Sequence, residues 1–461
     1  MIEGLKPYAE YKESGHSWLG AVPNHWSVLP NRALFDEVKD RNHPKEEMLS
    51  VTITRGIVRQ KALLDGSSKK DSSNLNKGAY KLVQPHDIAY NKMRAWQGAL
   101  GASTLRGIIS PAYVVMRPRQ EANPWFYHNL YRTPSFAKEA ERWSYGITSD
   151  MWSLRPEHFK VIGSVLPPPD EQASIVRFLD HANLKIDGFI RAKRKLIALL
   201  NEQKQAIIHR VVTYGLNPDA PLKPSGIPWI GDIPKHWVTP MNSRIFREHI
   251  RPHNGQQESP LSLSQRAGLI KTEHMQERSL KTSTYDNWKV TIPGDLVANR
   301  FKAHLGVFFA ATLRGIVSFH YAVFEPQRRM NTKYFELLYH TAPYRTIYAG
   351  RSNGMTVGLQ NLSNQNFYSV RAIVPPIKEQ DAIVAECEAA TRNQNAAIAR
   401  TEREIALIQE YRTRLTADVV TGKLDVREAA AKLPDLANEA HAEPDSDELF
   451  EEPELEESKN E

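Results

Sequence analysis

The nine-residue phrase WLGAVPNHW at residues 18–26 returns as WIGDIPKHW at residues 229–237. Two Trp, a Gly and a Pro recur at matched spacings, 211 residues apart. An internal repeat of this kind governs the whole fold, because each copy is expected to form the same structural unit. The phrase therefore predicts a chain built from two related halves.

The likeness extends far beyond the phrase, at a shift of 208 residues. Residues 85–115 align without gaps against residues 293–323, with 14 identities in 31 positions. The same shift relates two further pairs of segments: GITSDMWSL (146–154) with GMTVGLQNL (354–362), and LPPPDEQASIV (166–176) with VPPIKEQDAIV (374–384). Two long copies predict a duplicated module rather than a solenoid of short repeats.

Each copy has two parts of different texture. The first is rich in Gly, Pro and aromatic residues, and its short apolar runs, such as GIISPAYVVM and LGVFFAATLRGIVSFHYAVF, predict strands of a mixed α/β domain. The second follows a run of prolines: from Glu171 to about Tyr214 the chain has no Pro and one Gly. Residues at alternating spacings of four and three predict one long helix with a heptad seam. They are Ile175, Leu179, Ala182, Ile186, Phe189, Lys193, Leu196, Leu200, Gln203 and Ile207.

The second copy predicts a matching helix from Glu379 to about Thr421, with a stripe of Ile398, Ile405, Ile408 and Leu415. Neither helix is apolar all round, so we expect the two to pack on each other. The predicted fold class is α+β: two mixed α/β globular domains with pseudo-two-fold symmetry, separated by two long helices packed as an antiparallel coiled coil. A helix of about 42 residues is a rod of roughly 60 Å.

Six segments are predicted along the chain. They are a first globular domain (1–166), a first spacer helix (167–216), a linker (217–228), a second globular domain (229–374), a second spacer helix (375–424) and an acidic, disordered tail (425–461).

Bulk composition limits the class of protein. A chain of 461 residues with a mean hydropathy of −0.50 suits two to four water-soluble domains. No apolar run approaches the roughly 20 residues of a membrane helix, and the first residues do not resemble a signal peptide. Cys387 is the single cysteine, which excludes internal disulfides and a cysteine zinc site. We therefore expect a cytoplasmic protein without a bound metal.

Charge is unevenly distributed. Residues 436–461 contain 11 acidic residues and one Lys, and the remainder has 59 Lys and Arg against 42 Asp and Glu, a net charge of +17. A body this basic suits a polyanionic partner. A solvated surface with a disordered acidic tail explains the charge equally well.

The predicted architecture adds weight to a DNA partner. Two similar domains on an antiparallel helix pair match the local two-fold of duplex DNA. Each domain would recognise its own half-site, and a rod of roughly 60 Å permits half-site centres about one to two DNA turns apart. Because the two domains differ in sequence, the site would not be a palindrome.

Four phrases carry a resemblance to a known family: KPSGIPWIGDIPKHW, DIAYNKMRAWQGALG followed by GIISPAY, LPPPDEQASIVRFLD and VVTGKLDVR. Through them the chain resembles the specificity subunit of Type I restriction-modification enzymes. The phrases span about residues 5–427, nearly the whole chain.

The resemblance implies a non-catalytic, cytoplasmic, DNA-binding subunit of a host-defence restriction system. Residues 1–166 and 229–374 would be two target-recognition domains that bind a bipartite, non-palindromic site. The helices would serve as spacer and as docking surface for two methyltransferase subunits, joined by restriction (translocase) subunits. S-adenosylmethionine, ATP and Mg are then expected on the partner subunits, and no cofactor on this chain. A free-standing, two-headed DNA-binding regulator is the alternative.

Enzyme motifs are missing from the sequence. There is no Asn/Asp-Pro-Pro-aromatic stack, no phosphate loop and no His-Glu-x-x-His. Pro169–Asp170 with Glu202–Lys204 imitates a nuclease pattern, but on one helix the two parts lie roughly 45 Å apart, too far to share a metal. The DEQ and KEQ triplets that open the two helices are interpreted as N-terminal capping.

Candidate DNA contacts lie in three loops of each domain. The segments NKMRAWQG (91–98) and NRFKAHLG (299–306) combine cations with aromatic or amide groups, and the alternation of their cations predicts one shared face if the segments are extended. A structural hairpin, with Asn and Gly making the turn, explains them too. The candidates are Arg55, Lys92, Arg94, Trp96, Gln97, Arg142 and Tyr145 in the first copy, and Arg266, Arg300, Lys302, His304, Arg351 and Asn353 in the second.

Docking of partner subunits is assigned to apolar residues of the two helices. They are Ile175, Leu179, Ile186, Phe189, Leu196, Leu200 and Ile207 in the first helix, and Ile398, Ile405, Ile408 and Leu415 in the second.

Overall fold

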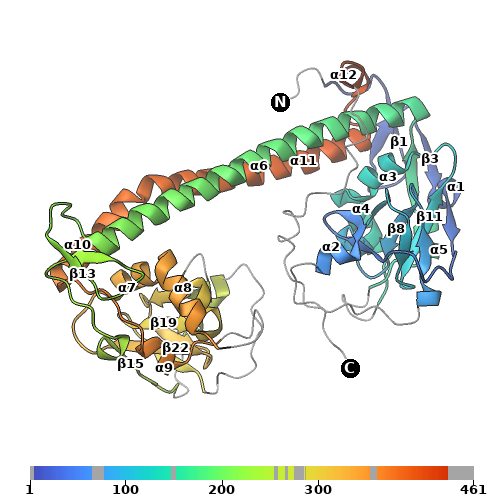
Figure 1. Ribbon diagram of the computed structural model, residues 1–461. Coiled ribbons are helices and arrows are strands. Elements are labelled where there is room, and N and C mark those ends of the chain that lie inside the picture. The colour runs from blue at the N-terminus through green and yellow to red at the C-terminus, as the bar shows by residue number, and fades with distance from the viewer. Residues whose placement is uncertain are drawn as a thin grey trace. The chain divides into compact units, whose positions relative to one another are not determined.

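The computed structural model describes residues 5–64, 77–146, 152–253, 258–264, 268–274, 285, 287–353 and 361–434. The chain folds into two compact units, of which the first is made from two stretches of sequence and the second from one (Figure 1). The first unit takes the chain up to Lys193 together with the part from Arg403, and the second runs from Arg194 to Glu402. Each unit therefore holds one globular head and part of each long helix. The heads are residues 5–166 and 217–374.

The first head is built around a four-stranded antiparallel sheet in the order β4-β11-β8-β9. Its strands are β1 (Tyr11–Glu13), β2 (Ala21–Pro23), β3 (Ser27–Pro30), β4 (Phe35–Val38), β5 (Leu49–Thr52), β6 (Gly56–Arg59), β7 (Lys81–Val83), β8 (Ile88–Asn91), β9 (Leu100–Ala102), β10 (Gly107–Ile109), β11 (Tyr113–Pro118) and β12 (Gly163–Leu166). Its helices are α1 (Asn31–Leu34), α2 (Gln60–Leu64), α3 (Pro124–Tyr131), α4 (Pro134–Arg142) and α5 (Pro156–Val161), with short 3₁₀ turns η1 (Lys77–Ala79) and η2 (Ala95–Gln97).

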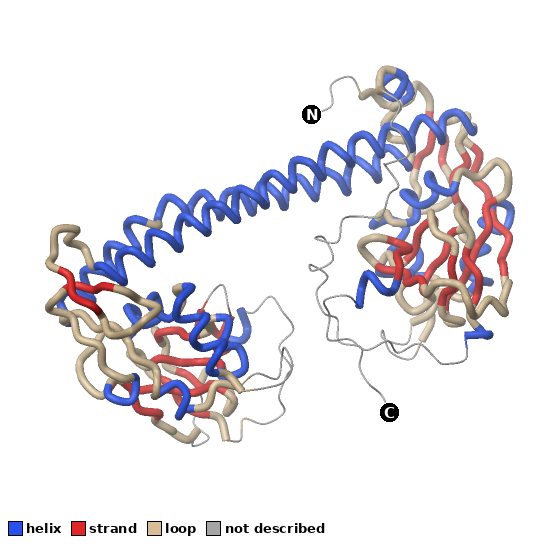
Figure 2. The backbone as a smooth tube through the Cα atoms, in the orientation of Figure 1, coloured by secondary structure: helices blue, strands red, loops and turns tan. Residues whose placement is uncertain are grey.

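The second head repeats this plan with the sheet order β15-β22-β19-β20. Its strands are β13 (Leu222–Pro224), β14 (Asp232–Pro234), β15 (Phe246–Glu248), β16 (Leu261–Ser264), β17 (Gly268–Lys271), β18 (Lys289–Thr291), β19 (Leu296–Asn299), β20 (Phe308–Ala310), β21 (Gly315–Val317) and β22 (Tyr321–Pro326). Its helices are α7 (Thr332–Tyr339), α8 (Ala342–Arg351) and α9 (Asn364–Tyr368), with 3₁₀ turns η4 (Asn242–Arg244), η5 (Thr272–His274) and η6 (Arg300–Leu305). Figure 2 shows strands accompanied by short helices in both heads.

Two long helices leave the heads. The first, α6, runs without interruption from Pro169 to Tyr214. The second is divided into α10 (Ile377–Ala390) and α11 (Arg392–Val420) at Thr391, whose ψ of 1° departs from the helix and whose hydroxyl donates to the Cys387 carbonyl at 2.7 Å. The sequence predicted one unbroken helix from Glu379, and this break differs from that prediction. Side-chain back-bonding by Thr is a common companion of a bend in a helix.

The helices pack antiparallel within each unit. In the first unit Lys193 pairs with Glu404 at 2.7 Å and Asp187 pairs with Arg412, so rising numbers on α6 meet falling numbers on α11. In the second unit Lys204 donates to the Asn395 side-chain oxygen at 3.2 Å. Among the described helices, none is both long and apolar enough to cross a membrane.

The register of the packed face on α6 differs from the predicted heptad seam. Phe189 is 63% exposed and Leu196 44% exposed, whereas Ile190 and Ile208 are buried. The inward positions 182, 186, 190, 193, 197, 201, 204 and 208 follow steps of four, four and three. That repeat of 11 residues in three turns stays close to the natural period of an α-helix, whereas a seven-residue repeat drifts by about 20° per heptad. The prediction was wrong because it imposed the heptad past Ile186.

Residues 425–434 also differ from the prediction of a disordered tail. Helix α12 (Arg427–Ala431) follows α11, and Val426 and Ala430 are buried in the core of the first head beside Leu415 and Val419. The Asp425 amide donates to the Lys6 carbonyl at 2.8 Å, which places the two ends of the described chain side by side. Burial of Val426 and Ala430, together with the backbone bridge between Lys6 and Asp425, explains why residues 425–434 are ordered. Residues 435–461 lie outside the described part.

The doubled phrase fixes each head to the start of its long helix. Trp26 is fully buried and donates its indole N–H to the Glu171 carboxylate at 3.0 Å, while Trp18 packs edge-on against Phe136. In the second copy Trp237 is fully buried and Trp229 packs edge-on against Tyr344. Both Trp of the phrase therefore have a structural role in packing the head, which explains why both copies retain them.

The Glu-Gln pairs of the DEQ and KEQ triplets hold the helix starts, and the predicted capping role is corrected. Glu171 is 4% exposed and accepts hydrogen bonds from Tyr8, His25 and Trp26. Burial, followed by the bond to Glu171, raises the pKa of Tyr8 far above its usual value. The side chain of Gln172 binds the backbone of Asn123, Glu121 and Pro167, and Gln380 binds that of Asn331 and Pro375.

We expect Glu171→Gln to lower the melting temperature more than Glu379→Gln. The amide of Gln cannot accept all three bonds, and an unsatisfied buried donor costs about 1–3 kcal/mol. Glu379 is the matched control because its side chain is 24% exposed and pairs with His236 alone among the described side chains. Thermal unfolding followed by circular dichroism measures both, and equal losses would contradict the anchoring role of Glu171.

Candidate nucleic-acid interface

The segment 91–98 is a tight turn between β8 and β9. The Asn91 side-chain oxygen accepts from the Met93 amide at 3.0 Å, η2 follows, and Gly98 closes the turn at φ 92°. Segment 299–306 has the same build: Asn299 accepts from the Phe301 amide at 3.0 Å, and Gly306 has φ 78°. The extended segment with two cations on one face was a wrong prediction, because Asn and Gly make a 3₁₀ turn here. The structural-hairpin interpretation of these identical residues is confirmed.

A second loop is hydrogen-bonded to this turn in each head. In the first head, Tyr145 bridges Ser153, and the Leu154 amide donates to the Lys92 carbonyl at 2.9 Å. The Trp96 and Trp152 rings meet edge-on, 5.6 Å apart. In the second head, Asn353 bridges Asn361 and the Leu362 amide donates to the Arg300 carbonyl at 3.0 Å. Residues 147–151 and 354–360 between the bridges lie outside the described part.

A third loop, the β5–β6 turn that carries Arg55, is tied to the same place by a buried guanidinium. Arg132 donates to the Leu100 carbonyl at 2.8 Å, to the Ile53 carbonyl at 2.9 Å and to the Thr54 carbonyl. Burial lowers the pKa of Arg132 to about 10. The three predicted loops of the first head are therefore brought together at one edge of its sheet.

The second head replaces this guanidinium with an imidazole. His340 stands 208 residues after Arg132, packs edge-on against Phe309 at 4.9 Å, and burial lowers its pKa to about 4. The imidazole is therefore neutral at physiological pH, and the head lacks the permanent buried charge of the first. Arg266, predicted for the matching turn, lies outside the described residues.

Exposure divides the predicted DNA contacts into two groups. Arg55, Lys92, Arg94, Trp96, Gln97 and His304 are half-buried, whereas Arg142, Tyr145, Lys302, Arg351 and Asn353 are exposed. Trp96 donates its indole N–H to the Met93 carbonyl at 2.9 Å, and Arg351 donates to the Ser369 hydroxyl at 2.6 Å. The exposed group keeps side chains available to a ligand, although Arg142 also lies 3.5 Å from Glu139.

Arg300 is committed to the interior of its head. Its guanidinium donates to Glu248 at 2.7 Å and to the Asn364 side chain at 3.0 Å, and Lys289 donates to the same Glu248 at 3.1 Å. Although burial opposes it, the bond from Asn364 and the charges of Arg300 and Lys289 keep the pKa of Glu248 below its usual value. Glu248 and Asn364 thus hold the Arg300 guanidinium against its own head, and its role as a DNA contact stays a prediction.

Sequence reasoning missed exposed aromatic side chains beside the turn of the second head. Phe301 is 38% exposed, Phe319 is 51% exposed, and His320 packs edge-on against Phe301 at 5.6 Å. The first head has Met93, Pro111 and Ala112 at these positions. The signal was present: each is a position at which two otherwise similar copies differ. The two heads thus share their scaffold and differ in the groups that they expose.

The residues predicted for partner docking also fall into two groups. Ile175, Leu179, Ile186 and Leu415 are buried inside the chain, so their predicted docking role is corrected to internal packing. Leu200, Ile207, Ile398, Ile405 and Ile408 are half-buried, and Phe189 and Leu196 are exposed.

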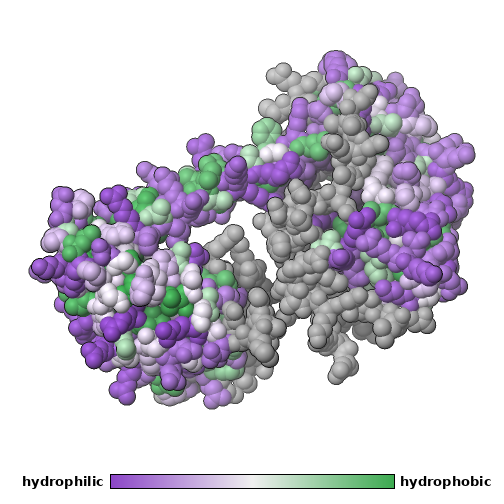
Figure 3. All heavy atoms as spheres, viewed as in Figure 1, coloured by the Kyte–Doolittle hydropathy of each residue, from purple (hydrophilic) through white to green (hydrophobic). Residues whose placement is uncertain are grey.

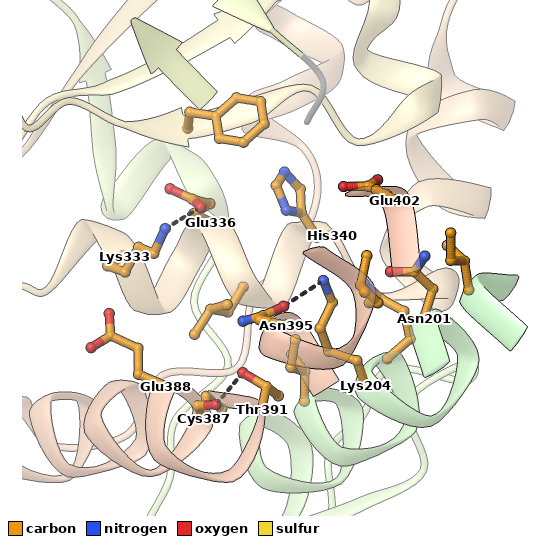
Figure 4. A pocket seen from close by; sticks show the side chains of 16 residues that line it. Asn201, Lys204, Lys333, Glu336, His340, Cys387, Glu388, Thr391, Asn395 and Glu402 are labelled. Carbon is orange, nitrogen blue, oxygen red and sulfur yellow. Dashed lines mark hydrogen bonds and ion pairs between the residues drawn. The ribbon is translucent and has the colours of Figure 1, made fainter. Parts of the chain in front are cut away.

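A cavity of about 590 Å³ lies in the second unit between the long helices and α7 (Figure 4). Lys333 pairs with Glu336 at its edge, and Lys204 reaches Asn395 across it. A smaller cavity of about 170 Å³ occupies the equivalent place in the first unit, lined by Trp125, His128, Asn129, Asp180, Asn183, Leu184 and Asp187. The two cavities lie at equivalent places, but different side chains line them. This is expected of a gap that remains wherever a head packs against its long helix. No cluster of three or more potential metal ligands occurs among the described residues.

No family model matches the chain, and no curated protein matches it at a significant level. Solved structures do match. A chain of a type I R-M system, solved in a study of complex assembly and conformational transition, superposes with a TM-score of 0.53 at 14% identity, over 87% of this chain and 98% of that one. The chain therefore shares the fold of that chain from a type I R-M system.

Two further matches are weaker. The HsdS subunit from Thermoanaerobacter tengcongensis is 15% identical over 87% of this chain and 98% of its own, with a TM-score of 0.36. The S subunit of a Type-I restriction-modification system from M. genitalium is 10% identical over 86% and 96%, with a TM-score of 0.33. The resemblance seen in the sequence and the predicted class, mixed α/β heads with long central helices, are confirmed.

We expect Arg132→Ala to destabilise the first head. Two carbonyls of the β5–β6 turn and one of β9 would lose their shared donor, and a buried carbonyl left unpaired costs about 1–3 kcal/mol. Arg142→Ala is the matched control: its side chain is 67% exposed, and such surface changes stay within about 0.5 kcal/mol. Hydrogen exchange of residues 53–56 and thermal unfolding report the difference, and an unchanged β5–β6 turn in R132A would contradict the proposed tie.

Asp180 predicts a pH dependence of stability. Burial raises its pKa from 3.8 to about 7, so the folded chain binds more protons at this group than the unfolded chain between those values. Stability therefore falls as pH rises from about 4 to about 7, by up to about 4 kcal/mol. Asp180→Asn removes this loss and should raise the melting temperature at pH 8 more than at pH 4. The equivalent exposed position offers the control Glu388→Gln, for which we expect no such gain.

Proposed function

We propose that this chain is the DNA sequence-specificity subunit of a Type I restriction-modification complex, and that it recognises a bipartite, non-palindromic DNA site. The observation that carries the proposal is the pair of heads with one scaffold and different exposed side chains. A protein that reads two unlike half-sites needs this combination, because phosphate contacts position the protein and base contacts specify the sequence.

The three joined loops are the surface that we assign to DNA. In the second head, Lys302 and Phe301 stand exposed on the turn after β19, with Phe319 and His320 beside them. A cation suits a phosphate, and aromatic side chains suit the T methyl group or the sugar edge. In the first head, Arg142 and Tyr145 flank the second loop and Met93 takes the place of Phe301. Half-buried Trp96, Gln97 and Arg94 shape this surface from below.

The basic character of the chain supports a polyanionic ligand. Outside residues 436–461 the net charge is +17. A surface excess of Lys and Arg increases the rate and the salt dependence of DNA binding.

The complex is completed by other subunits in this proposal. Two methyltransferase subunits and the restriction subunits would supply catalysis, together with S-adenosylmethionine, ATP and Mg, and this chain would bind none of these cofactors. Of the predicted docking residues, Phe189 and Leu196 on α6 are the ones classed as exposed in the described part of the chain. A cytoplasmic location follows from the same proposal.

A domain exchange tests the proposal directly. The chain is co-expressed with its methyltransferase subunit, and methylated adenines are mapped across the genome. We expect one two-part motif, and replacement of residues 229–374 by those of another specificity subunit should change one half while the other half stays. A motif that is unchanged, or that changes on both sides, would overturn the proposal.

Point variants refine the test. Phe301→Ala and Lys302→Ala should act on the half-site that the domain exchange assigns to the second head, and binding should weaken by about 1–3 kcal/mol for each base pair that is no longer recognised. K302A should weaken binding to all DNA sequences if Lys302 contacts a phosphate. F301A should reduce the sequence preference at one base pair of the half-site. Arg244→Ala, at an exposed Arg of the same head outside the candidate loops, is the control of equal charge change, and we expect a smaller effect.

A free-standing, two-headed DNA-binding regulator is the second candidate function, favoured by the same heads and the same basic charge. It requires no methyltransferase partner. Size-exclusion chromatography of the co-expressed subunits distinguishes the two candidate functions. A specificity subunit elutes together with its methyltransferase partner, whereas a regulator elutes alone.

A further inference from the structure

One side of α6 carries an exposed apolar row. Phe189, Leu196 and Leu199 are 63%, 44% and 54% exposed, and with Ala192 they recur at helical spacings of three and four. We call these four residues the outward stripe. Apolar patches lie among polar ones along the long helices in the space-filling view (Figure 3). A contiguous exposed apolar surface of this kind marks an interaction site more often than chance.

The outward stripe is bordered by positive charge. Residues 185–204 contain six Lys and Arg against two acidic residues. Asp187 is paired with Arg412, and Lys193 is paired with Glu404. The exposed Lys185 lies one turn before Phe189, and the exposed Lys195 lies one turn before Leu199. Neither has an ion-pair partner among the described residues. An occupant of the stripe should therefore be both apolar and acidic.

The chain itself contains a segment of that chemistry. Residues 436–461 have 11 acidic residues and one Lys, and the stretch DELFEEPELEE (447–457) sets Leu449, Phe450 and Leu455 among carboxylates. A segment that served only to imitate DNA phosphates would need the carboxylates and not the Leu and Phe. Acidic and apolar residues mixed in this way are typical of segments that bind a basic, apolar surface.

The segment can reach the stripe. The last described residue is Pro434, and the Arg177 guanidinium of α6 binds the carbonyl of its neighbour Leu433. Along α6, Phe189 lies about 18 Å from Arg177, and Leu199 about 33 Å. Leu449 follows Pro434 by 15 residues, which span up to about 50 Å when extended.

Leu407 on α11 is also an exposed apolar side chain, but its surroundings suit the acidic, apolar segment less well. It is 64% exposed, with only Tyr411 as an exposed apolar neighbour one turn away among the described residues. Residues 400–414 contain four Arg against three Glu, so this face is nearly neutral.

We propose that residues 436–461 bind within the same chain along the outward stripe of α6. Leu449 and Phe450 contact Phe189 and Leu196, and the carboxylates lie beside Lys185 and Lys195. Any protein partner that uses this face of α6 must first displace the segment. The inference concerns the chain alone and does not depend on the proposed DNA function.

Site-specific photo-cross-linking in the purified full chain tests this site. Phe189 is replaced by p-benzoylphenylalanine, which an exposed position tolerates, and the same replacement at Leu407 is the matched control. After illumination, peptide mapping should place the Phe189 cross-link within residues 436–461 of the same chain. We expect a yield about tenfold above that from position 407, and a lower yield at about 1 M salt, where the charges are screened.

A variant of the segment separates specific binding from charge attraction. The double substitution Leu449→Ser and Phe450→Ser keeps all carboxylates and should reduce the Phe189 cross-link about tenfold, because two apolar side chains lose their burial. Equal yields at positions 189 and 407, or an unchanged yield in L449S/F450S, would mean unspecific attraction and overturn the proposal. No cross-link, or one that joins two chains, would overturn it too, the latter in favour of a second copy as occupant. Circular dichroism confirms that each variant is folded.

Discussion

The buried polar residues at the start of each long helix are the constraint on which both units depend. Burial of a carboxylate such as Glu171 is costly unless hydrogen-bond donors surround it, and its donors come from the N-terminal segment and from the doubled Trp phrase. Gln172 and Gln380 bind the backbone on either side in the same way. Each head is therefore fixed to its helix by directional bonds rather than by apolar packing alone. Apolar packing by itself would leave the angle between a head and its helix poorly defined.

The two copies do not solve this problem identically, and the difference is instructive. Glu171 gathers three donors, whereas Glu379 is bonded to His236, and the indole nitrogen of Trp237 has no hydrogen-bond partner in the described part of the chain. The first unit has an additional element, α12, and Arg427 lies 5.3 Å from the centre of the Tyr8 ring. The extra donors thus occur where residues 425–431 pack beside the N-terminal segment around Lys6 and Tyr8. The second unit has a continuous chain at that point and needs fewer ties.

Much of this architecture was predictable from sequence because it is written twice. The repeat fixed the two heads, the long helices and their partnership, and the comparison of copies separated scaffold residues such as Asn91 and Gly98 from exposed, variable ones. What failed were details that need three dimensions. The heptad was extended past Ile186 because a sequence pattern cannot distinguish 3.5 from 3.67 residues per turn over a few turns. Of the two interpretations of segment 91–98, an extended segment and a tight turn, the sequence could not choose, because alternating cations suit both. Arg132 and Glu248 were missed because their bonding partners are distant in sequence, and so was the bond between Arg300 and Glu248.

The meeting of Lys6 and Asp425 on the first head has a consequence for topology. Helix α6 runs into the second head through residues 212–237 in the way that α11 runs into the first head, except that the peptide link is absent there. The same two elements, a long helix and a head, are thus joined by a continuous chain in the second unit and by a backbone hydrogen bond between Lys6 and Asp425 in the first. A circular permutant, opened in the 217–228 segment and joined between its old ends by a short linker, would keep the four-stranded sheet of each head and the antiparallel pairing of the long helices.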